Sequence, residues 1–237
     1  MTATSALSGA ETSPGRNSLR AIDLQGPAGR LEALLNEGAP GSRFAGLVCH
    51  PYPPGGGTMH NKVVYHAARV LNAPEWNFQL PVLRFNFRGT GLSEGKHDGL
   101  AESDDVIAAL NWLHAEYNLP IVLVGFSFGA AMAIAACCTD ARSMTDARIH
   151  ALVAIGLPTQ GFGRHYQYPS LSGCKLPKFF LSGDHDQFAP SGDLQQVLST
   201  VAEPKSLVLI SGADHFFTGR LEAMQEALAA WLKERVA

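Results

Sequence analysis

Residues 121–138 read Ile-Val-Leu-Val-Gly-Phe-Ser-Phe-Gly-Ala-Ala-Met-Ala-Ile-Ala-Ala-Cys-Cys, and this stretch decides the fold. Its first four residues form a short apolar run, which is typical of a strand buried on both faces of a sheet. From Phe128 to Cys138 the chain is apolar all round, which predicts a buried helix. Between strand and helix lies Gly125-Phe126-Ser127-Phe128-Gly129. The stretch therefore predicts a sharp turn with Ser127 at its centre.

A turn of this kind favours a nucleophilic role for Ser127. It strains the backbone at the serine, exposes the hydroxyl, and needs small residues two before and two after it so that strand and helix can approach. It also aims the N–H of Phe128 and the positive end of the helix at an oxyanion beside Ser127. The alternative is a serine in a tight turn whose glycines serve packing alone. The position between a buried strand and a buried helix favours the nucleophile.

Apolar runs and helical patterns alternate along the rest of the chain. A turn at Gly26–Gly29 joins the first two runs as an antiparallel hairpin, and the later runs are continuously apolar, as in a parallel sheet. The pattern predicts an α/β fold with a mostly parallel eight-stranded sheet covered by helices. The predicted strands are Leu19–Leu24, Leu31–Asn36, Phe44–Cys49, Val82–Phe87, Ile121–Gly125, Ala151–Gly156, Lys178–Leu181 and Ser206–Ile210. The predicted helices are Asn61–Leu71, Ala101–His114, Phe128–Cys138 and Gly219–Val236.

The segment 157–177 is rich in proline and glycine and too short for a helical cap domain. We therefore expect no cap domain and a site open to solvent. Without the apolar wall that a cap supplies, such a site favours substrates with short acyl chains.

Composition narrows the class of protein. The 237 residues are 46% hydrophobic and 16% charged, which suits one globular domain over residues 19–237. The net charge of −3, without a basic block, argues against nucleic-acid binding. No apolar run reaches the roughly 18 residues of a membrane span. Residues 1–18 lack the apolar core of a secretory signal, so we expect a disordered tail, with a transit peptide as the alternative.

The four cysteines include no C-x-x-C pair, and two of them are adjacent. This usage predicts reduced, mostly buried thiols in a reducing compartment, hence the cytoplasm. Nothing in the sequence identifies a protein partner. The cysteines are Cys49, Cys137, Cys138 and Cys174.

A serine nucleophile needs a base, and His215 is the strongest of nine histidines. It follows the predicted strand Ser206–Ile210, and the carboxyl ends of parallel strands are where such sites assemble. The alternative for His215 is a loop histidine that caps the last helix. The acid is expected after the strand Lys178–Leu181, where Asp184 and Asp186 compete. Asp184 suits the turn itself. We favour Asp186, further into the loop, to fix the histidine tautomer and stabilise the imidazolium.

The same acids and histidines also allow a metal-site interpretation. No spacing among them resembles a zinc signature, and a metal would leave Ser127 unexplained. The sequence therefore predicts neither metal nor cofactor. The residues concerned are Asp184, His185, Asp186, Asp214 and His215.

The second oxyanion donor is expected in the loop His50-Pro51-Tyr52-Pro53-Pro54-Gly55-Gly56-Gly57. Proline has no N–H, so the amide of Tyr52 is the predicted donor. The glycines lack the Gly-Lys-Ser/Thr of a phosphate loop and instead let the loop pass close to an acyl group. The predicted pocket residues are Phe126, Phe216, Phe217 and Gly56, with the segment 162–168 beside them.

Arg88 follows the predicted strand Val82–Phe87 and has two interpretations. It binds an anionic substrate, or it ties its own loop to the fold. We favour the structural role.

Taken together, several motifs resemble those of small lidless bacterial α/β-hydrolases, the predicted esterases of the dienelactone-hydrolase-like group. The resemblance covers residue 22 to the end of the chain. It implies the α/β-hydrolase fold, a cofactor-free serine hydrolase acting on esters or thioesters, and Asp186 as the acid. Dienelactone hydrolase has a cysteine nucleophile where this chain has Ser127, so a lactone substrate does not follow. The motifs are His50-Pro51, Gly56-Gly57-Thr58-Met59, Asn61-Lys62-Val63-Val64, Arg84-Phe85-Asn86-Phe87-Arg88-Gly89, Gly125-Phe126-Ser127-Phe128-Gly129, Gly183-Asp184-His185-Asp186 and His215-Phe216-Phe217.

The sequence thus predicts a carboxylesterase-like serine hydrolase for short-chain carboxylic esters or thioesters, acting through an acyl-enzyme on Ser127. A peptidase or perhydrolase with the same catalytic residues is one alternative. A non-catalytic protein that uses the same fold to bind a ligand is another.

Overall fold

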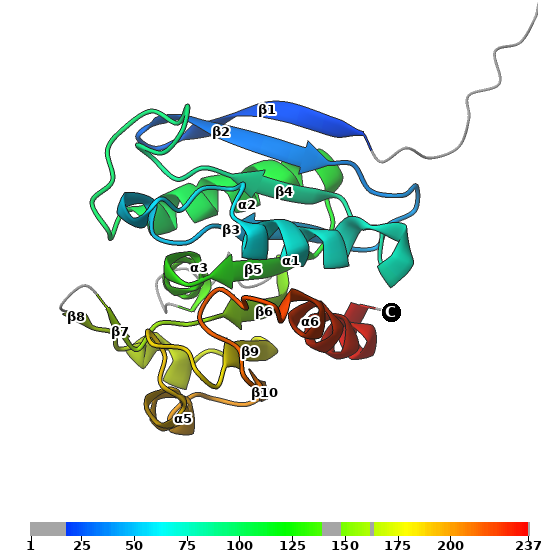
Figure 1. Ribbon diagram of the computed structural model, residues 1–237. Helices are drawn as coiled ribbons and strands as arrows, with labels where there is room; N and C mark the ends of the chain where they lie inside the picture. Colours follow the sequence, from blue (N-terminus) through cyan, green and yellow to red (C-terminus); the bar gives the residue numbers. More distant parts are fainter. Residues whose placement is uncertain (1–17, 139–147, 162–163, 237) are drawn as a thin grey trace, which may run out of the picture.

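The computed structural model describes residues 18–138, 148–161 and 164–236 (Figure 1). The tail expected at the N-terminus lies, up to residue 17, outside the described residues.

One eight-stranded sheet forms the centre of the molecule (Figure 1). Its order is β1-β2-β4-β3-β5-β6-β9-β10; β2 is antiparallel to both neighbours, and the other adjacent pairs are parallel. The prediction of a hairpin followed by a parallel sheet is confirmed. The bounds are β1 Leu19–Gly26, β2 Gly29–Asn36, β3 Ala45–Cys49, β4 Val82–Phe85, β5 Ile121–Phe126, β6 Ile149–Ile155, β9 Lys178–Gly183 and β10 Lys205–Ile210.

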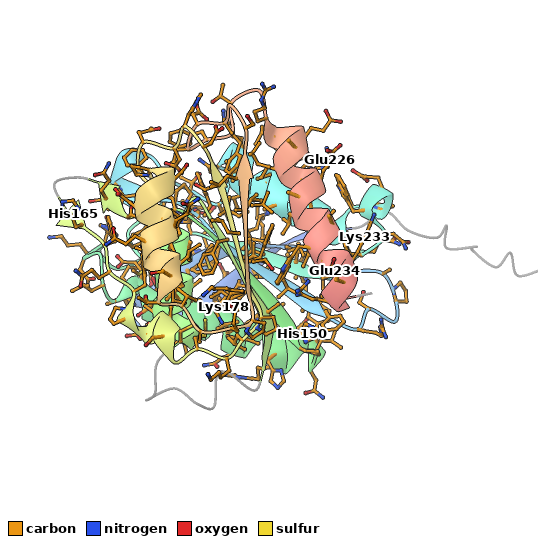
Figure 2. The ribbon with its side chains drawn as sticks, turned by 90° about the horizontal axis from the view of Figure 1, so that it is seen from below. His150, His165, Lys178, Glu226, Lys233 and Glu234 are labelled. Carbon is orange, nitrogen blue, oxygen red and sulfur yellow. A yellow bond between two sulfur atoms is a disulfide. The ribbon has the colours of Figure 1, made fainter. Side chains whose placement is uncertain are left out.

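Helices cover both faces of the sheet. On one face α1 (Lys62–Asn72) and α6 (Leu221–Val236) pack together over an apolar layer that includes Val124 and Phe179. On the other face lie α2 (Glu102–Tyr117), α3 (Phe128–Cys137) and α5 (Ser191–Ser199). Figure 2 shows α5 and α6 on opposite sides of the sheet.

The central strands have continuously apolar sequences because both of their faces are buried. All six residues of β5 are buried, because helices cover it on both sides. By contrast, β2 alternates between buried and partly exposed residues. The carboxyl ends of β5, β9 and β10 lead into the loops that hold Ser127, Asp186 and His215. Lys178 and His150 mark the opposite, amino-terminal ends of β9 and β6 (Figure 2).

The segment after β6 holds no cap in its described part. It contains the small hairpin of β7 (Gln160–Gly161) and β8 (Arg164–His165) and a turn of 3-10 helix at Pro169–Ser172. The expectation that the segment 162–168 lies beside the pocket is confirmed for Tyr166, which lines the cavity at Ser127 together with Pro158 and Gly161. Residues 162 and 163 lie outside the described residues.

The prediction of four reduced thiols is wrong for one pair. Cys138 at the end of α3 and Cys174 before β9 form a disulfide, with their Cα atoms 5.1 Å apart. Cys49 and Cys137 are buried thiols. A separation of 36 residues gives no hint that these two positions meet. Among the described helices, none combines the length and apolar character needed to cross a bilayer.

Candidate active site

Ser127 occupies the strained turn between β5 and α3. Its φ is 54° and its ψ −119°, a conformation that a residue with a side chain rarely adopts. The turn is held because the Ser127 N–H donates to the carbonyl of Ile155 at 2.9 Å. Strained backbone of this kind persists where the surrounding structure over-determines it.

The glycines on either side of the turn are required by close packing. A Cβ on Gly125 would lie 2.4 Å from the carbonyl oxygen of Gly129. A Cβ on Gly129 would lie 2.5 Å from the carbonyl oxygens of Cys49 and His50. Any larger side chain at these positions would push α3 away from β5 or β3 and move Ser127.

Ser127, His215 and Asp186 form a continuous hydrogen-bonded chain. The Oγ of Ser127 lies 3.0 Å from His215 Nε2, and His215 Nδ1 lies 2.8 Å from Asp186 Oδ2. Only 2% of His215 and of Asp186 is exposed, against 9% of Ser127. A base that is hydrogen-bonded to both a hydroxyl and a carboxylate can take the hydroxyl proton and keep one tautomer.

The loop after β9 fixes the Asp186 carboxylate from several sides. Oδ1 accepts the N–H groups of Phe188 at 2.8 Å and Ala189 at 3.1 Å, and Oδ2 accepts the Ser182 hydroxyl at 3.0 Å. Asp184, the rival acid, accepts the N–H of Gly212 at 2.7 Å instead. The structure thus brings Asp186 to His215, whereas Asp184 joins its loop to the one after β10.

Tyr52 and Phe128 both line the cavity that contains Ser127. Their rings meet edge to face with centroids 5.8 Å apart. Phe128 is the first residue of α3, where backbone N–H groups have no partner inside the helix and the helix dipole favours an anion. Both predicted oxyanion donors therefore come from residues beside the serine.

His50 holds the loop that carries Tyr52. The Phe87 N–H donates to His50 Nε2 at 3.0 Å, so the ring proton is on Nδ1 and is donated to the Pro51 carbonyl at 2.7 Å. Burial lowers the pKa of His50 from 6.5 to about 4, although the bond to Pro51 opposes this shift. A neutral imidazole therefore links the end of β4 to the Tyr52 loop.

Further contacts from the end of β4 hold the same region. The Met59 N–H donates to Asn86 Oδ1 at 2.8 Å, while Asn86 Nδ2 donates to Glu32 at 2.7 Å. Arg88 forms a buried ion pair with Asp105, Nη2 to Oδ1 at 2.6 Å, and its own N–H donates to the same carboxylate. Arg88 thus has the structural role that we favoured.

The cavity at Ser127 has a volume of about 90 Å³. Of the predicted pocket residues, Gly56 and Phe216 line it. The prediction is wrong for Phe126 and Phe217, which are almost fully buried in the apolar layer beneath α1 and α6. The ring of Phe126 lies below the His215 ring, with centroids 5.0 Å apart, and supports it from the core side.

Several lining residues were not predicted, among them Asn61, Gln160 and Phe188. Phe188 lies two residues after Asp186, and its ring centroid is 4.7 Å from that of His215. Its proximity to the predicted acid was the signal that could have found it. Among the described residues, no group of three or more His, Cys, Asp or Glu side chains is arranged to hold a metal ion.

The sequence of the chain is similar to those of known proteins. Residues 55–234 match the family model described as "Alpha/beta hydrolase domain". An uncharacterized protein of Rickettsia prowazekii is 34% identical over 222 residues, which are 89% of this chain and 87% of that protein.

Two similar solved structures point the same way. An alpha-beta serine hydrolase homologue from Coxiella burnetii is 33% identical, with a TM-score of 0.78 over 93% of this chain and all of that one. A serine hydrolase without lid from Xanthomonas campestris is 28% identical, with a TM-score of 0.77 over 95% of this chain and 98% of that one. Both share the α/β fold of the described residues.

Proposed function

Because the chain belongs to the alpha/beta-hydrolase family, we propose that it is a carboxylesterase-like serine hydrolase that cleaves short-chain carboxylic esters or thioesters through an acyl-enzyme on Ser127. The observation that carries the proposal is the chain of contacts from Ser127 Oγ through His215 to Asp186, with distances of 3.0 and 2.8 Å.

The reaction proceeds in two halves. His215 Nε2 takes the Ser127 proton as Oγ attacks the substrate carbonyl, and the amides of Phe128 and Tyr52 stabilise the oxyanion. The carbon–oxygen or carbon–sulfur bond then breaks, and His215 gives the proton to the leaving alcohol or thiol. Water attacks the acyl-enzyme by the same route, which releases the acid and restores Ser127. Asp186 keeps its negative charge throughout and stabilises the imidazolium.

The cavity supports a short acyl group. About 90 Å³ beside Ser127 accommodates the carbonyl and a few carbon atoms, since about 10–15 Å³ on the same measure is enough to hold one water molecule. The glycine loop, through Gly56, and Phe216 border this space.

The decisive experiment compares wild type with Ser127→Ala on p-nitrophenyl esters from acetate to laurate. We expect the substitution to lower kcat/KM by roughly a thousandfold or more, and acetate or butyrate to be preferred. Labelling by a fluorophosphonate, which traps activated serines, is expected for wild type and lost in the variant. Equal rates in both proteins, with no labelling, would favour a non-catalytic binding protein.

We also propose that the protein is located in the cytoplasm, and the disulfide provides a test of this location. Structural disulfides are typical of oxidising compartments, so a cytoplasmic chain is expected to hold Cys138 and Cys174 as thiols in the cell. Alkylation of acid-quenched cells, followed by mass spectrometry of both cysteines, reports their state. A fully oxidised pair would contradict the cytoplasmic location.

A further inference from the structure

A second and larger cavity adjoins the one at Ser127. Its volume is about 410 Å³, against about 90 Å³ for the catalytic cavity. Tyr52, Phe128 and Tyr166 line both cavities, so the two spaces meet across these three side chains. Ser127 and His215 line the catalytic cavity and not the second one. The second cavity therefore extends the site without holding the reacting groups.

Besides Tyr52, three parts of the fold build its walls: the loop 97–100 after β4, the first two turns of α3, and the segment 165–170 after β6. The lining from α3 is apolar throughout, which suits an apolar occupant. The loop adds Leu100 beside the polar His97 and Asp98, and the segment 165–170 mixes aromatic and polar side chains. The apolar side chains are Leu100, Phe128, Ala131, Met132, Ile134 and Ala135.

The loop wall is held in place. The fully buried carboxylate of Glu102 accepts the N–H groups of Asp98 and Gly99, both at 3.0 Å, and lies 2.6 Å from His97 Nδ1. The His97 ring in turn meets the rings of Tyr52 and Phe128, with centroids 5.4 and 5.5 Å apart. A cavity with walls fixed in this way is a pre-formed binding site, as small-molecule sites usually are.

We propose that the second cavity is the leaving-group subsite and takes an apolar alcohol or thiol arm of the substrate. The inference rests on the proposed function, because a short acyl group fills the catalytic cavity and stays bound to Ser127 after the first step. The other arm must lie elsewhere and must depart before water attacks. A route out exists at the rim, where 78% of Leu100 is exposed. The substrate class is thus a short-chain acyl ester, or thioester, of an apolar alcohol or thiol.

The test uses two matched ester series with the whole chain and follows acid release at constant pH. One series keeps the acetyl group and lengthens the alcohol from ethyl to butyl to hexyl. The other keeps the ethyl group and lengthens the acyl chain from acetate to hexanoate. We expect kcat/KM to rise by about fourfold for each methylene buried in the alcohol series. The acyl series is expected to be flat or falling.

Two variants and one control connect this rise to the cavity. Ala135→Phe fills it from a partly exposed position on α3, and Leu100→Ser makes its exposed rim polar. We expect the ratio of kcat/KM for hexyl acetate over ethyl acetate to fall to near one in Ala135→Phe, and severalfold in Leu100→Ser. Ala108→Phe, at a partly exposed position on α2, is the matched control and is expected to keep the wild-type ratio.

The outcomes separate this inference from the function beneath it. Ser127-dependent turnover with a flat alcohol series would overturn the leaving-group subsite alone. A rise along the acyl series that Ala135→Phe abolishes would also overturn it, because the cavity would then hold the acyl chain. No Ser127-dependent turnover of any ester would overturn the proposed function and this inference with it.

Discussion

At the scale of single residues, the proposed mechanism requires that an oxygen atom of residue 186 accepts the proton on His215 Nδ1. In Asp186→Asn an amide of similar shape replaces the carboxylate that accepts this proton at 2.8 Å. The amide NH₂ can face Nδ1 only if the ring adopts the wrong tautomer. We expect kcat to fall by about 10⁴-fold, as in comparable triads, while the fold is retained. Steady-state kinetics with p-nitrophenyl acetate and circular dichroism measure the two effects.

The matched control is Asp184→Asn, two residues away in the same loop. Asp184 accepts the Gly212 N–H and has no contact with His215, so its change is expected to alter kcat by less than about threefold. If Asp184→Asn were the inactive variant and Asp186→Asn the active one, the assignment of the acid would be wrong.

His50 gives a prediction about pH. Burial lowers its pKa from 6.5 to about 4, so below pH 6.5 a proton binds the unfolded chain more readily than the folded one. The contribution of neutral His50 to stability is therefore complete above about pH 6.5 and is lost as the pH falls toward 4. It amounts to about 3 kcal/mol at most. His50→Gln, which cannot ionise there, is expected to be less stable at pH 7 but to lose less stability on acidification.

Urea unfolding of wild type and His50→Gln at pH 7 and pH 4.5 checks this prediction. The difference between the two proteins removes the contributions of other titrating groups. An identical loss of stability in both would mean that His50 does not cause the pH dependence.

The residues of the candidate site could be proposed from the sequence because the order of strands and loops limits which side chains can meet. A serine at a strand-to-helix turn, an acid after β9 and a histidine after β10 must meet at one edge of a parallel sheet. The role of His50 was not predictable, since its ring partners, the Phe87 N–H and the Pro51 carbonyl, are defined only by tertiary structure. Phe217 was misplaced because its backbone, with φ at 53°, turns the ring into the core.

At the scale of elements, the position of α3 against β3 controls the serine. Gly129→Ala would place a Cβ 2.5 Å from the carbonyl oxygens of Cys49 and His50. Backbone atoms cannot yield as a flexible side chain would, so α3 must shift. We expect a loss of about 2–4 kcal/mol in the free energy of unfolding and at least a hundredfold loss of kcat/KM. Urea unfolding and ester hydrolysis measure both.

Gly192→Ala in α5 is the control for this steric argument. A Cβ there meets nothing within 4 Å, and alanine has the higher helix propensity. The expected result is a gain of up to about 1 kcal/mol with unchanged activity. If both glycine substitutions had the same effect, the close approach at Gly129 would not be the cause.

The elements themselves divide into predictable and unpredictable ones. The eight strands were found to within about two residues, because a continuously apolar run such as that of β5 fits a buried strand and is too short for a buried helix. Helix α5 was missed because its nine residues include Gly192 and bury only Leu194 and Leu198, too short an apolar pattern to stand out. Its stability comes from packing against the sheet and not from its own sequence.

At the scale of the whole molecule, the disulfide joins two parts of the site. Cys138 ends the helix that begins beside Ser127, and Cys174 ends the segment that carries Tyr166, a wall of both cavities. The bridge closes a loop between residues 36 apart in sequence. Such a cross-link lowers the entropy of the unfolded chain. In the chain-entropy model this raises the free energy of unfolding by about 3–4 kcal/mol for a loop of this length.

We therefore expect a reductant such as dithiothreitol to lower the Tm of the oxidised protein by several degrees, roughly 2–4 °C for each kcal/mol lost. Cys174→Ser is the control, since it lacks the bridge and is expected to melt at the lower temperature with or without reductant. Mass spectrometry after alkylation counts the thiols in each sample. Four alkylated thiols in the untreated wild type would contradict the bridge directly. A bridge that forms without changing Tm would show instead that the buried core around α3 and β9 already restrains the two ends.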